Sequence, residues 1–237
     1  MKKRYWWVII TYIIVQFSGI LFAPLLYLTL PISEVDAVIY WSIFSFAVGL
    51  IIVLLIMRPD MRAGSQRNAS STGQVILWSI LGVFMAFIAQ GVAAMIEIEV
   101  FGIDPGSENT QVIMDVARAA PLFMIIPAVI APILEEIIFR KIIFGGLYER
   151  TNFFIAALLS ALIFGIIHGE PQHILVYASM GFVFAFLYVK TKRIIVPIIV
   201  HMAMNTIVVI AQFNLTPEEI ERMQQQLQDL QMIFFGG

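Results

Sequence analysis

The residues that could do chemistry in this sequence lie inside its most apolar stretches. Glu135 and Glu136 are adjacent in the segment APILEEIIFRKIIFGG. His168 ends the segment FGIIH, and His201 begins the segment HMAMN. An ionisable group inside a membrane costs several kcal/mol unless it is paired or hydrated, so such groups indicate function by default. A carboxylate and two imidazoles that converge could hold a water molecule and deprotonate it.

Helical spacing gives the two glutamates different predicted roles. Glu136 precedes Arg140 by four residues, the favourable order for an ion pair within a helix. Glu135 points about 100° away on the same helix and has no partner there. Burial raises the pKa of a carboxyl group without a partner, and a carboxylate poised nearer neutrality suits a general base. Lys141, one residue further on, is expected to reach the cytoplasmic surface.

The other polar residues sit on two further apolar segments. Phe164 and His168 share one helix face, and so do His201 and Asn205. If the helices pack together, an imidazole and an amide could stabilise an oxyanion. Each residue also has a structural interpretation, as a helix pair, a core histidine or an interhelical contact. His173, in the loop GEPQH, is interpreted as a solvated residue.

The composition predicts an integral membrane protein. Of the 237 residues 60% are hydrophobic and 13% are charged, and the mean hydropathy is +0.92. Soluble domains are about 45–50% apolar and about 25% charged. The absence of cysteine excludes disulfides and thiol catalysis. The basic start precedes an apolar run too long for a signal peptide, so we interpret it as a retained first span.

The predicted fold class is an all-α polytopic membrane protein, because about 20 apolar residues cross a bilayer as a helix. We expect about seven transmembrane helices surrounding an intramembrane polar cavity, plus a C-terminal amphipathic helix. The candidate spans are residues 5–30, 37–57, 74–101, 120–147, 153–168, 172–189 and 194–213.

Charge predicts the orientation of these spans. If the chain alternates, twelve of the fourteen basic residues fall on one side of the membrane. By the positive-inside rule the N-terminus is then cytoplasmic and the C-terminus external. The twelve are Lys2, Lys3, Arg4, Arg58, Arg62, Arg67, Arg140, Lys141, Arg150, Lys190, Lys192 and Arg193.

The chain divides into three parts by motif. Residues 1–110 hold three spans without an assigned motif, residues 111–213 form the predicted catalytic helical core, and residues 214–237 form a tail. Thr216, Pro217 and Glu219 have the pattern of a helix start. The helix that follows has one apolar face, which predicts either a helix lying on the membrane or on the protein, or a coiled-coil dimer contact. That face contains Ile220, Met223, Leu227 and Leu230.

The motifs EEIIFR, FGIIH and HMAMN, in this order on separate membrane helices, resemble the Abi family of intramembrane proteases. This family is also called CPBP, for CAAX proteases and bacteriocin-processing enzymes. The resemblance covers about residues 120–210 and implies an endopeptidase of several helices around a water-filled cavity. It implies a membrane-associated or lipidated protein or peptide as substrate, in a bacterial plasma membrane, and no nucleic-acid partner.

The same resemblance assigns a role to each motif residue. Glu135 would activate the water, and His168 would assist it or bind the water. His201 and Asn205 would bind the water and the oxyanion. Arg140 would hold Glu136. Phe164 would support the site as part of its motif.

Metal dependence has two possible answers. Glu135, His168 and His201 match a catalytic zinc set in residue type. No HExxH motif occurs, so three separate helices would have to supply the ligands. A glutamate with two histidines could activate water without zinc, and we favour that interpretation over a tightly bound metal.

Two other classes of function fit parts of the pattern. A catalytically silent membrane scaffold or immunity protein could use the same fold to bind a partner. An ion-coupled transporter also uses intramembrane glutamate and histidine. Against the transporter, the sequence shows neither repeated halves nor paired broken helices. The sequence defines no substrate, cleavage site or oligomeric state.

Overall fold

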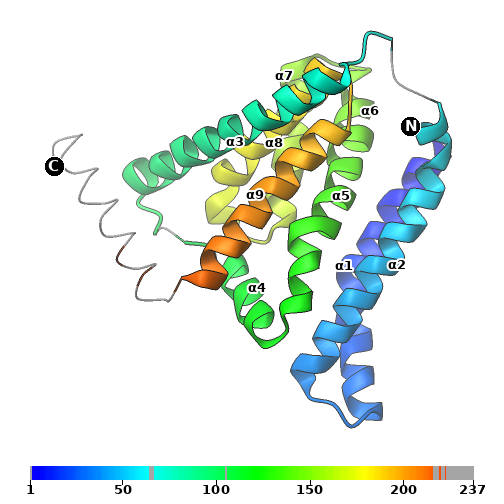
Figure 1. Ribbon diagram of the computed structural model, residues 1–237, viewed down its shortest axis with the longest axis vertical. Coiled ribbons are helices and arrows are strands. Elements are labelled where there is room, and N and C mark those ends of the chain that lie inside the picture. Colours follow the sequence, from blue (N-terminus) through cyan, green and yellow to red (C-terminus); the bar gives the residue numbers. More distant parts are fainter. Residues whose placement is uncertain (1, 64–66, 105, 216–218, 220–221, 223–237) are drawn as a thin grey trace.

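The computed structural model describes residues 2–63, 67–104, 106–215, 219 and 222, and within these ranges every regular element is a helix (Figure 1). The first part contains α1 (Lys3–Thr29), α2 (Glu34–Arg62), α3 (Thr72–Phe101) and α4 (Glu108–Ala119). One continuous helical segment then combines η1 (Pro121–Met124), η2 (Ile126–Ile130), α5 (Ala131–Glu135), η3 (Glu136–Phe144) and α6 (Gly145–Tyr148); we call it the 121–148 helix. The last part contains α7 (Phe153–Ile167), η4 (Pro171–His173), α8 (Ile174–Thr191) and α9 (Ile195–Asn214).

The predicted class, an all-α multi-pass membrane protein, is confirmed. Among the described residues, 6 helices are long and apolar enough to cross a membrane. They are α1, α2, α3, the 121–148 helix, the segment Pro171–Thr191 and α9. The fifth of the seven predicted spans corresponds to α7, an apolar helix of only 15 residues. The predicted C-terminal amphipathic helix lies outside the described residues.

The shortness of α7 matters for the depth of its last residues. A helix of 15 residues is about 22 Å long, whereas the hydrocarbon core is about 30 Å thick. His168 caps the C-terminus of α7. A helix of this length that starts at one membrane surface therefore brings His168 to a depth inside the bilayer.

The basic segments gather at one end of the molecule, which we call the basic end (Figure 1, top). Arg4 and Lys2 at the start of α1 pair with Asp60 near the end of α2, at 2.6 and 3.2 Å. Arg193, between α8 and α9, donates from Nε to the carbonyl of Ser70, before α3, at 3.2 Å. The basic loops that the sequence assigned to one side thus lie together, and α4 lies at the opposite end.

Small residues allow the helices to approach closely, as is common in membranes. A Cβ atom at Gly82 of α3 would lie 2.7 Å from side-chain carbons of both Leu187 and Val200. A Cβ atom at Gly181 of α8 would lie 3.0 Å from the Cβ of Ala161 on α7. These contacts fix α3 against α8 and α9, and α8 against α7.

The N-terminal helices share a core with the segment that carries the motifs. One cluster of buried side chains takes members from α1, α2, the 121–148 helix and α7. Val8 and Tyr12 come from α1, and Phe139 and Phe164 come from motif-bearing helices. Packing therefore places α1 beside the predicted catalytic residues.

The 121–148 helix is wound more loosely than an α-helix over two stretches. In η2 and η3 the backbone bonds run from a residue to the carbonyl five residues earlier, as from Ala131 to Ile126 and from Gly145 to Arg140. Pro132 has no N–H with which to continue the ordinary pattern. Such π-type turns are frequent at functional sites. Here they free the carbonyl of Pro127, which accepts a side-chain hydrogen bond from α9.

Candidate active site

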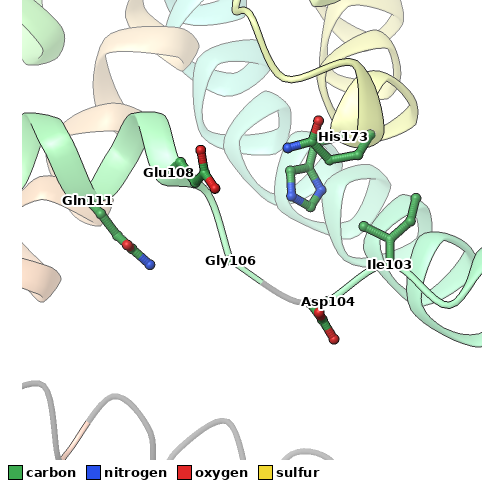
Figure 2. A pocket seen from close by; sticks show the side chains of 7 residues that line it. Ile103, Asp104, Gly106, Glu108, Gln111 and His173 are labelled. Carbon is green, nitrogen blue, oxygen red and sulfur yellow. The ribbon is translucent and has the colours of Figure 1, made fainter.

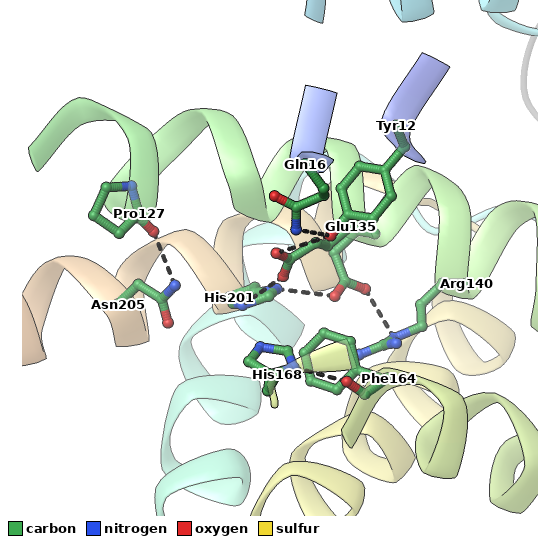
Figure 3. Close-up of polar contacts among 10 residues, drawn as sticks. Tyr12, Gln16, Pro127, Glu135, Arg140, Phe164, His168, His201 and Asn205 are labelled. Carbon is green, nitrogen blue, oxygen red and sulfur yellow. Dashed lines mark hydrogen bonds and ion pairs between the residues drawn. The ribbon is translucent and has the colours of Figure 1, made fainter. Parts of the chain in front are cut away.

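His201 contacts both adjacent glutamates through its two ring nitrogens, and Figure 3 shows it beside Glu135. Its Nδ1 is 3.0 Å from Oε1 of Glu136, and its Nε2 is 3.7 Å from Oε2 of Glu135. Glu136 also faces a guanidinium, so it is the ionised acceptor and Nδ1 carries the hydrogen. The other ring nitrogen, Nε2, faces Glu135.

The ion pair expected from the four-residue spacing is present. Nε of Arg140 lies 3.0 Å from Oε2 of Glu136, and both side chains are fully buried. The terminal nitrogens of Arg140 have no hydrogen-bond partner among the described residues. Its guanidinium carbon instead lies 4.7 Å from the ring centroid of Phe164 and 5.1 Å from that of Phe184, a cation–π arrangement. Arg140 thus holds Glu136 inside an aromatic enclosure.

His168 is held on two sides. Its Nδ1 lies 2.7 Å from the carbonyl oxygen of Phe164, and because a carbonyl only accepts, Nδ1 donates. Its ring stacks on Tyr177 with centroids 4.2 Å apart and planes at 26°. The Nε2 atom of His168 takes no part in the hydrogen bond with Phe164.

Phe164 joins the two imidazoles. Its ring centroid is 4.4 Å from that of His168 and 5.9 Å from that of His201, both in edge-to-face geometry. The imidazoles of His168 and His201 therefore both lie against the buried ring of Phe164 (Figure 3). The shared face predicted for Phe164 and His168 is confirmed by this contact.

Asn205 bonds to the backbone of the 121–148 helix. Its Nδ2 donates to the carbonyl oxygen of Pro127 at 2.9 Å, which ties α9 to the 121–148 helix (Figure 3). The amide has a second N–H hydrogen that this bond does not use. The assignment of Asn205 to the oxyanion stays a prediction, since its hydrogen bond to Pro127 is a structural one.

Two residues that the sequence interpretation missed come from α1. The hydroxyl of Tyr12, a buried side chain, lies 3.5 Å from Oε1 of Glu135. Nε2 of Gln16 donates to the same hydroxyl oxygen at 3.0 Å. A tyrosine and a glutamine four residues apart inside an apolar span would have been the signal, because a polar pair on one face of a membrane helix needs a partner.

The carboxylate of Glu135 is consequently bound only loosely by its neighbours. Its contacts are the 3.5 Å approach of Tyr12 and the 3.7 Å approach of His201, both at or beyond the range of a good hydrogen bond. The residue is 9% exposed, against 0% for Glu136. Glu135 is therefore held by longer contacts than its neighbour Glu136.

A second pair of buried carboxylates, Glu97 and Glu170, lies at the end of the molecule opposite the basic end. Glu97 accepts from the backbone N–H groups of Leu175 and Val176, at 3.0 and 3.1 Å, and so caps α8. Its other oxygen is 3.0 Å from Nδ1 of His173. The interpretation of His173 as a solvated residue is wrong, because burial of Glu97 by tertiary packing provides it with a partner.

His173 also lines a polar hollow of about 300 Å³ at this end (Figure 2). The carboxylates of Asp104 and Glu108 belong to the same lining. This hollow is separate from the motif residues and contains none of them.

The zinc alternative finds no assembled ligand set. Within the described ranges, no three histidine or acidic side chains lie together in a way that could hold a metal ion. Glu135 and His201 approach one another at 3.7 Å, but His168 does not complete a three-residue group with them. The residues as arranged do not fit a metal, so the mechanism proposed below contains no step through one.

A bundle of membrane helices that encloses carboxylates and imidazoles defines a membrane protein with an intramembrane polar centre. Comparison with protein families matches residues 117–207 to the family described as "Type II CAAX prenyl endopeptidase Rce1-like". The chain is therefore matched over the whole region of the three motifs, from Glu135 to Asn205, whereas Tyr12 lies outside the match.

Two curated proteins extend this likeness. The chain is 49% identical over 246 residues to a Bacillus subtilis (strain 168) protein named as membrane peptidase YdiL, covering 100% of this chain and 99% of that protein. It is 38% identical over 166 residues to the membrane-embedded CAAX protease MroQ of Staphylococcus aureus (strain USA300), covering 68% and 67%. The protein belongs to the Abi/CPBP family of CAAX-protease-like membrane peptidases, as its motifs predicted. No solved structure matches the chain.

Proposed function

We propose that this protein is an intramembrane endopeptidase that hydrolyses peptide bonds with a water molecule activated by Glu135. The observation that carries the proposal is the contrast within the adjacent pair. Glu136 is held at 3.0 Å by both Arg140 and His201, whereas the contacts of Glu135 are 3.5 and 3.7 Å long. A carboxylate that its own protein leaves incompletely bonded, inside a buried site, is suited to general-base catalysis.

In the proposed first step, the water lies within hydrogen-bond distance of Glu135 and of Nε2 of His201. Glu135 takes a proton from the water as the oxygen attacks the carbonyl carbon of the scissile bond. The carbonyl oxygen becomes an oxyanion. In the second step the carbon–nitrogen bond breaks, and the proton held by Glu135 passes to the leaving amine.

The chain Arg140–Glu136–His201 serves as the support for this step. Arg140 keeps Glu136 ionised and in place, and Glu136 accepts from Nδ1 of His201 and so fixes the orientation of the imidazole. Orientation of a catalytic histidine by a buried carboxylate is a recurrent arrangement in hydrolases. Arg140 and Glu136 are therefore positioning residues in the proposal.

His168 and Asn205 complete the proposed site. Nε2 of His168 assists Glu135 or binds the same water. The second N–H hydrogen of Asn205 is assigned to the oxyanion together with His201. The hydroxyl of Tyr12, from α1, limits the movement of the Glu135 carboxylate. Residues 111–213 thus carry the catalytic core, and residues 1–110 contribute Tyr12 to it.

The proposed substrates are membrane-associated or lipidated proteins or peptides. The site lies among helices that cross the bilayer, and one relative is named as a CAAX protease. We propose a bacterial plasma membrane as the location, with the N-terminus cytoplasmic and the C-terminus external. The gathering of the basic loops at one end of the molecule supports this orientation.

The proposal is tested by comparing the termini of membrane proteins from cells that express the wild type, Glu135→Gln or Glu99→Gln at matched levels. Glu99 is exposed on α3 and provides the same change of charge away from the site. We expect a set of new termini with the wild type and Glu99→Gln that is missing with Glu135→Gln. If all three samples have the same termini while the proteins are folded and abundant, the protein is not acting as a peptidase, and a scaffold role becomes the better account.

A further inference from the structure

A chain of contacts connects His168 through Tyr177 with the buried carboxylate of Glu170, near the start of α4. The imidazole contacts the Phe164 ring edge to face and stacks on the ring of Tyr177 from α8. The Tyr177 hydroxyl donates to Oε2 of Glu170 at 2.5 Å. Glu170 is 5% exposed and follows His168 by two residues, with Gly169 at φ +76° between them. His168 is therefore linked to Glu170 in two ways, through the backbone of Gly169 and through the ring of Tyr177.

Glu170 is itself fixed by the start of α4. Oε2 of Glu170 accepts from the Ser107 hydroxyl at 2.8 Å, and Oε1 accepts from the backbone N–H of Asn109 at 3.1 Å. Burial alone would raise the pKa of Glu170, but the hydrogen bonds from Tyr177, Asn109 and Ser107 outweigh it and lower the pKa below its ordinary value. Glu170 is thus an ionised acceptor at neutral pH, and it presents a stationary oxygen to Tyr177.

Close packing of α7 against α8 brings Tyr177 to the imidazole. A Cβ atom at Gly165 would lie 3.0 Å from the Ile174 side chain and 3.5 Å from Cβ of Tyr177. The stacking distance of 4.2 Å between the rings of His168 and Tyr177 depends on this approach. A displacement of Tyr177 would leave His168 in contact with the carbonyl and the ring of Phe164 and without its stacking partner.

We propose that Tyr177 and Glu170 are positioning residues that hold the imidazole of His168 in the orientation required for hydrolysis. The inference rests on the proposed function, because it gives His168 a part in the reaction. Neither residue belongs to the three motifs, and neither touches Glu135 or His201. Their contribution is geometric: Glu170 fixes the Tyr177 hydroxyl, and the Tyr177 ring fixes the plane of His168. A catalytic group displaced by about 1 Å can lose about 100-fold in rate.

The chain offers a matched control for Glu170. Glu97 is also a buried carboxylate at the opposite end, and it also accepts three hydrogen bonds. Its hydrogen bonds come from His173 and from the backbone N–H groups of Leu175 and Val176, so they include neither His168 nor Tyr177. Glu97→Gln therefore measures the general effect of removing such a charge, without removing the hydrogen bond between Tyr177 and Glu170.

The test follows the ring signals of His168 by NMR in the full-length chain, labelled at histidine and held in detergent micelles. The chain has 3 histidines, so substitution of each in turn assigns the signals. We expect the largest shift of the His168 signal in Tyr177→Leu, which loses the ring. Smaller shifts are expected in Tyr177→Phe and Glu170→Gln, which keep the ring and change only its hydrogen bond to residue 170. Glu97→Gln is expected to shift the His173 signal and leave that of His168 in place.

Kinetics on the peptide cleaved by the wild type supply the second readout. Tyr177→Phe and Glu170→Gln are expected to lower kcat by about 10- to 100-fold with KM unchanged, while Glu97→Gln keeps the wild-type kcat. The proposal is overturned if Glu170→Gln and Tyr177→Phe match Glu97→Gln in both the His168 signal and kcat. Because the NMR signal does not require cleavage, failure of this proposal and failure of the proposed function give different results.

Discussion

Two pairs of carboxylates are buried among the described residues, and the two pairs are bonded differently. At the opposite end from the basic loops, Glu97 and Glu170 each accept three hydrogen bonds of 3.1 Å or less. In the 121–148 helix, Glu136 has two contacts of 3.0 Å, and Glu135 has only the two contacts of 3.5 and 3.7 Å. Burial is common to all four residues, so burial alone does not mark the reactive one.

The difference teaches how to separate structural from reactive carboxylates in a membrane protein. A buried carboxylate with a full set of donors gains stability from them and has no remaining capacity to bind a proton or a substrate. A carboxylate with long contacts pays the desolvation cost without full compensation, which evolution tolerates where the group has chemistry to do. By this criterion we propose Glu135 as the reactive member of the four.

Among the variants that test this comparison, Arg140→Met is expected to have the largest effect on stability and activity. It would leave Glu136 ionised and buried without its cation, a loss of about 3–5 kcal/mol of stability. We expect a much lower unfolding temperature in detergent and no activity. The double variant Glu136→Leu/Arg140→Met removes both charges and should regain part of the stability. It should remain inactive, because His201 has lost its acceptor; an active double variant would show that Glu136 does not position His201.

A smaller effect is expected from Tyr12→Phe. The hydroxyl is 3.5 Å from Glu135, at the limit of hydrogen bonding, so its loss should cost little stability. We expect kcat to fall by less than about 10-fold, or about 1.4 kcal/mol. Tyr27→Phe is the matched control, because Tyr27 is 41% exposed on the same helix. Equal kcat in the two variants would show that α1 does not take part in the site.

Metal chelation is expected to have the smallest effect. The residues are not arranged as a metal site within the described ranges, so prolonged treatment of the purified protein with a strong zinc chelator should leave kcat unchanged. Loss of activity that is restored by added Zn²⁺ would show that Glu135, His168 and His201 rearrange around an ion. That outcome would mean that Glu135 has long contacts with its neighbours because it serves as a metal ligand.

Much of this architecture could be predicted from the sequence because its signals are local. Hydropathy identifies the long spans, and charge groups the loops that Arg4 and Arg193 now hold together. The spacing of Glu136 and Arg140 was sufficient to predict their ion pair. These features depend on residues that are neighbours in the chain or on one side of a membrane.

The remaining features depend on packing between distant segments. The π-type turns that expose the Pro127 carbonyl to Asn205 have no unambiguous sequence pattern. From the sequence alone, Glu97 and Glu170 would be interpreted as surface charges near loops. They are buried because α8 and α4 pack against them. The contact of Tyr12 with Glu135 joins residues 123 positions apart. A single sequence does not record such pairings.

The central claim is that Glu135 is reactive where Glu97 is structural, and the most direct test measures both properties in both variants. Cleavage rate and unfolding temperature would be determined on the same preparations of the wild type, Glu135→Gln and Glu97→Gln. We expect Glu135→Gln to lose about 10²- to 10⁴-fold in kcat with an unchanged unfolding temperature. Glu97→Gln should keep its kcat and lose about 1–3 kcal/mol of stability. Wild-type cleavage by Glu135→Gln, or loss of cleavage by a folded Glu97→Gln, would contradict the account.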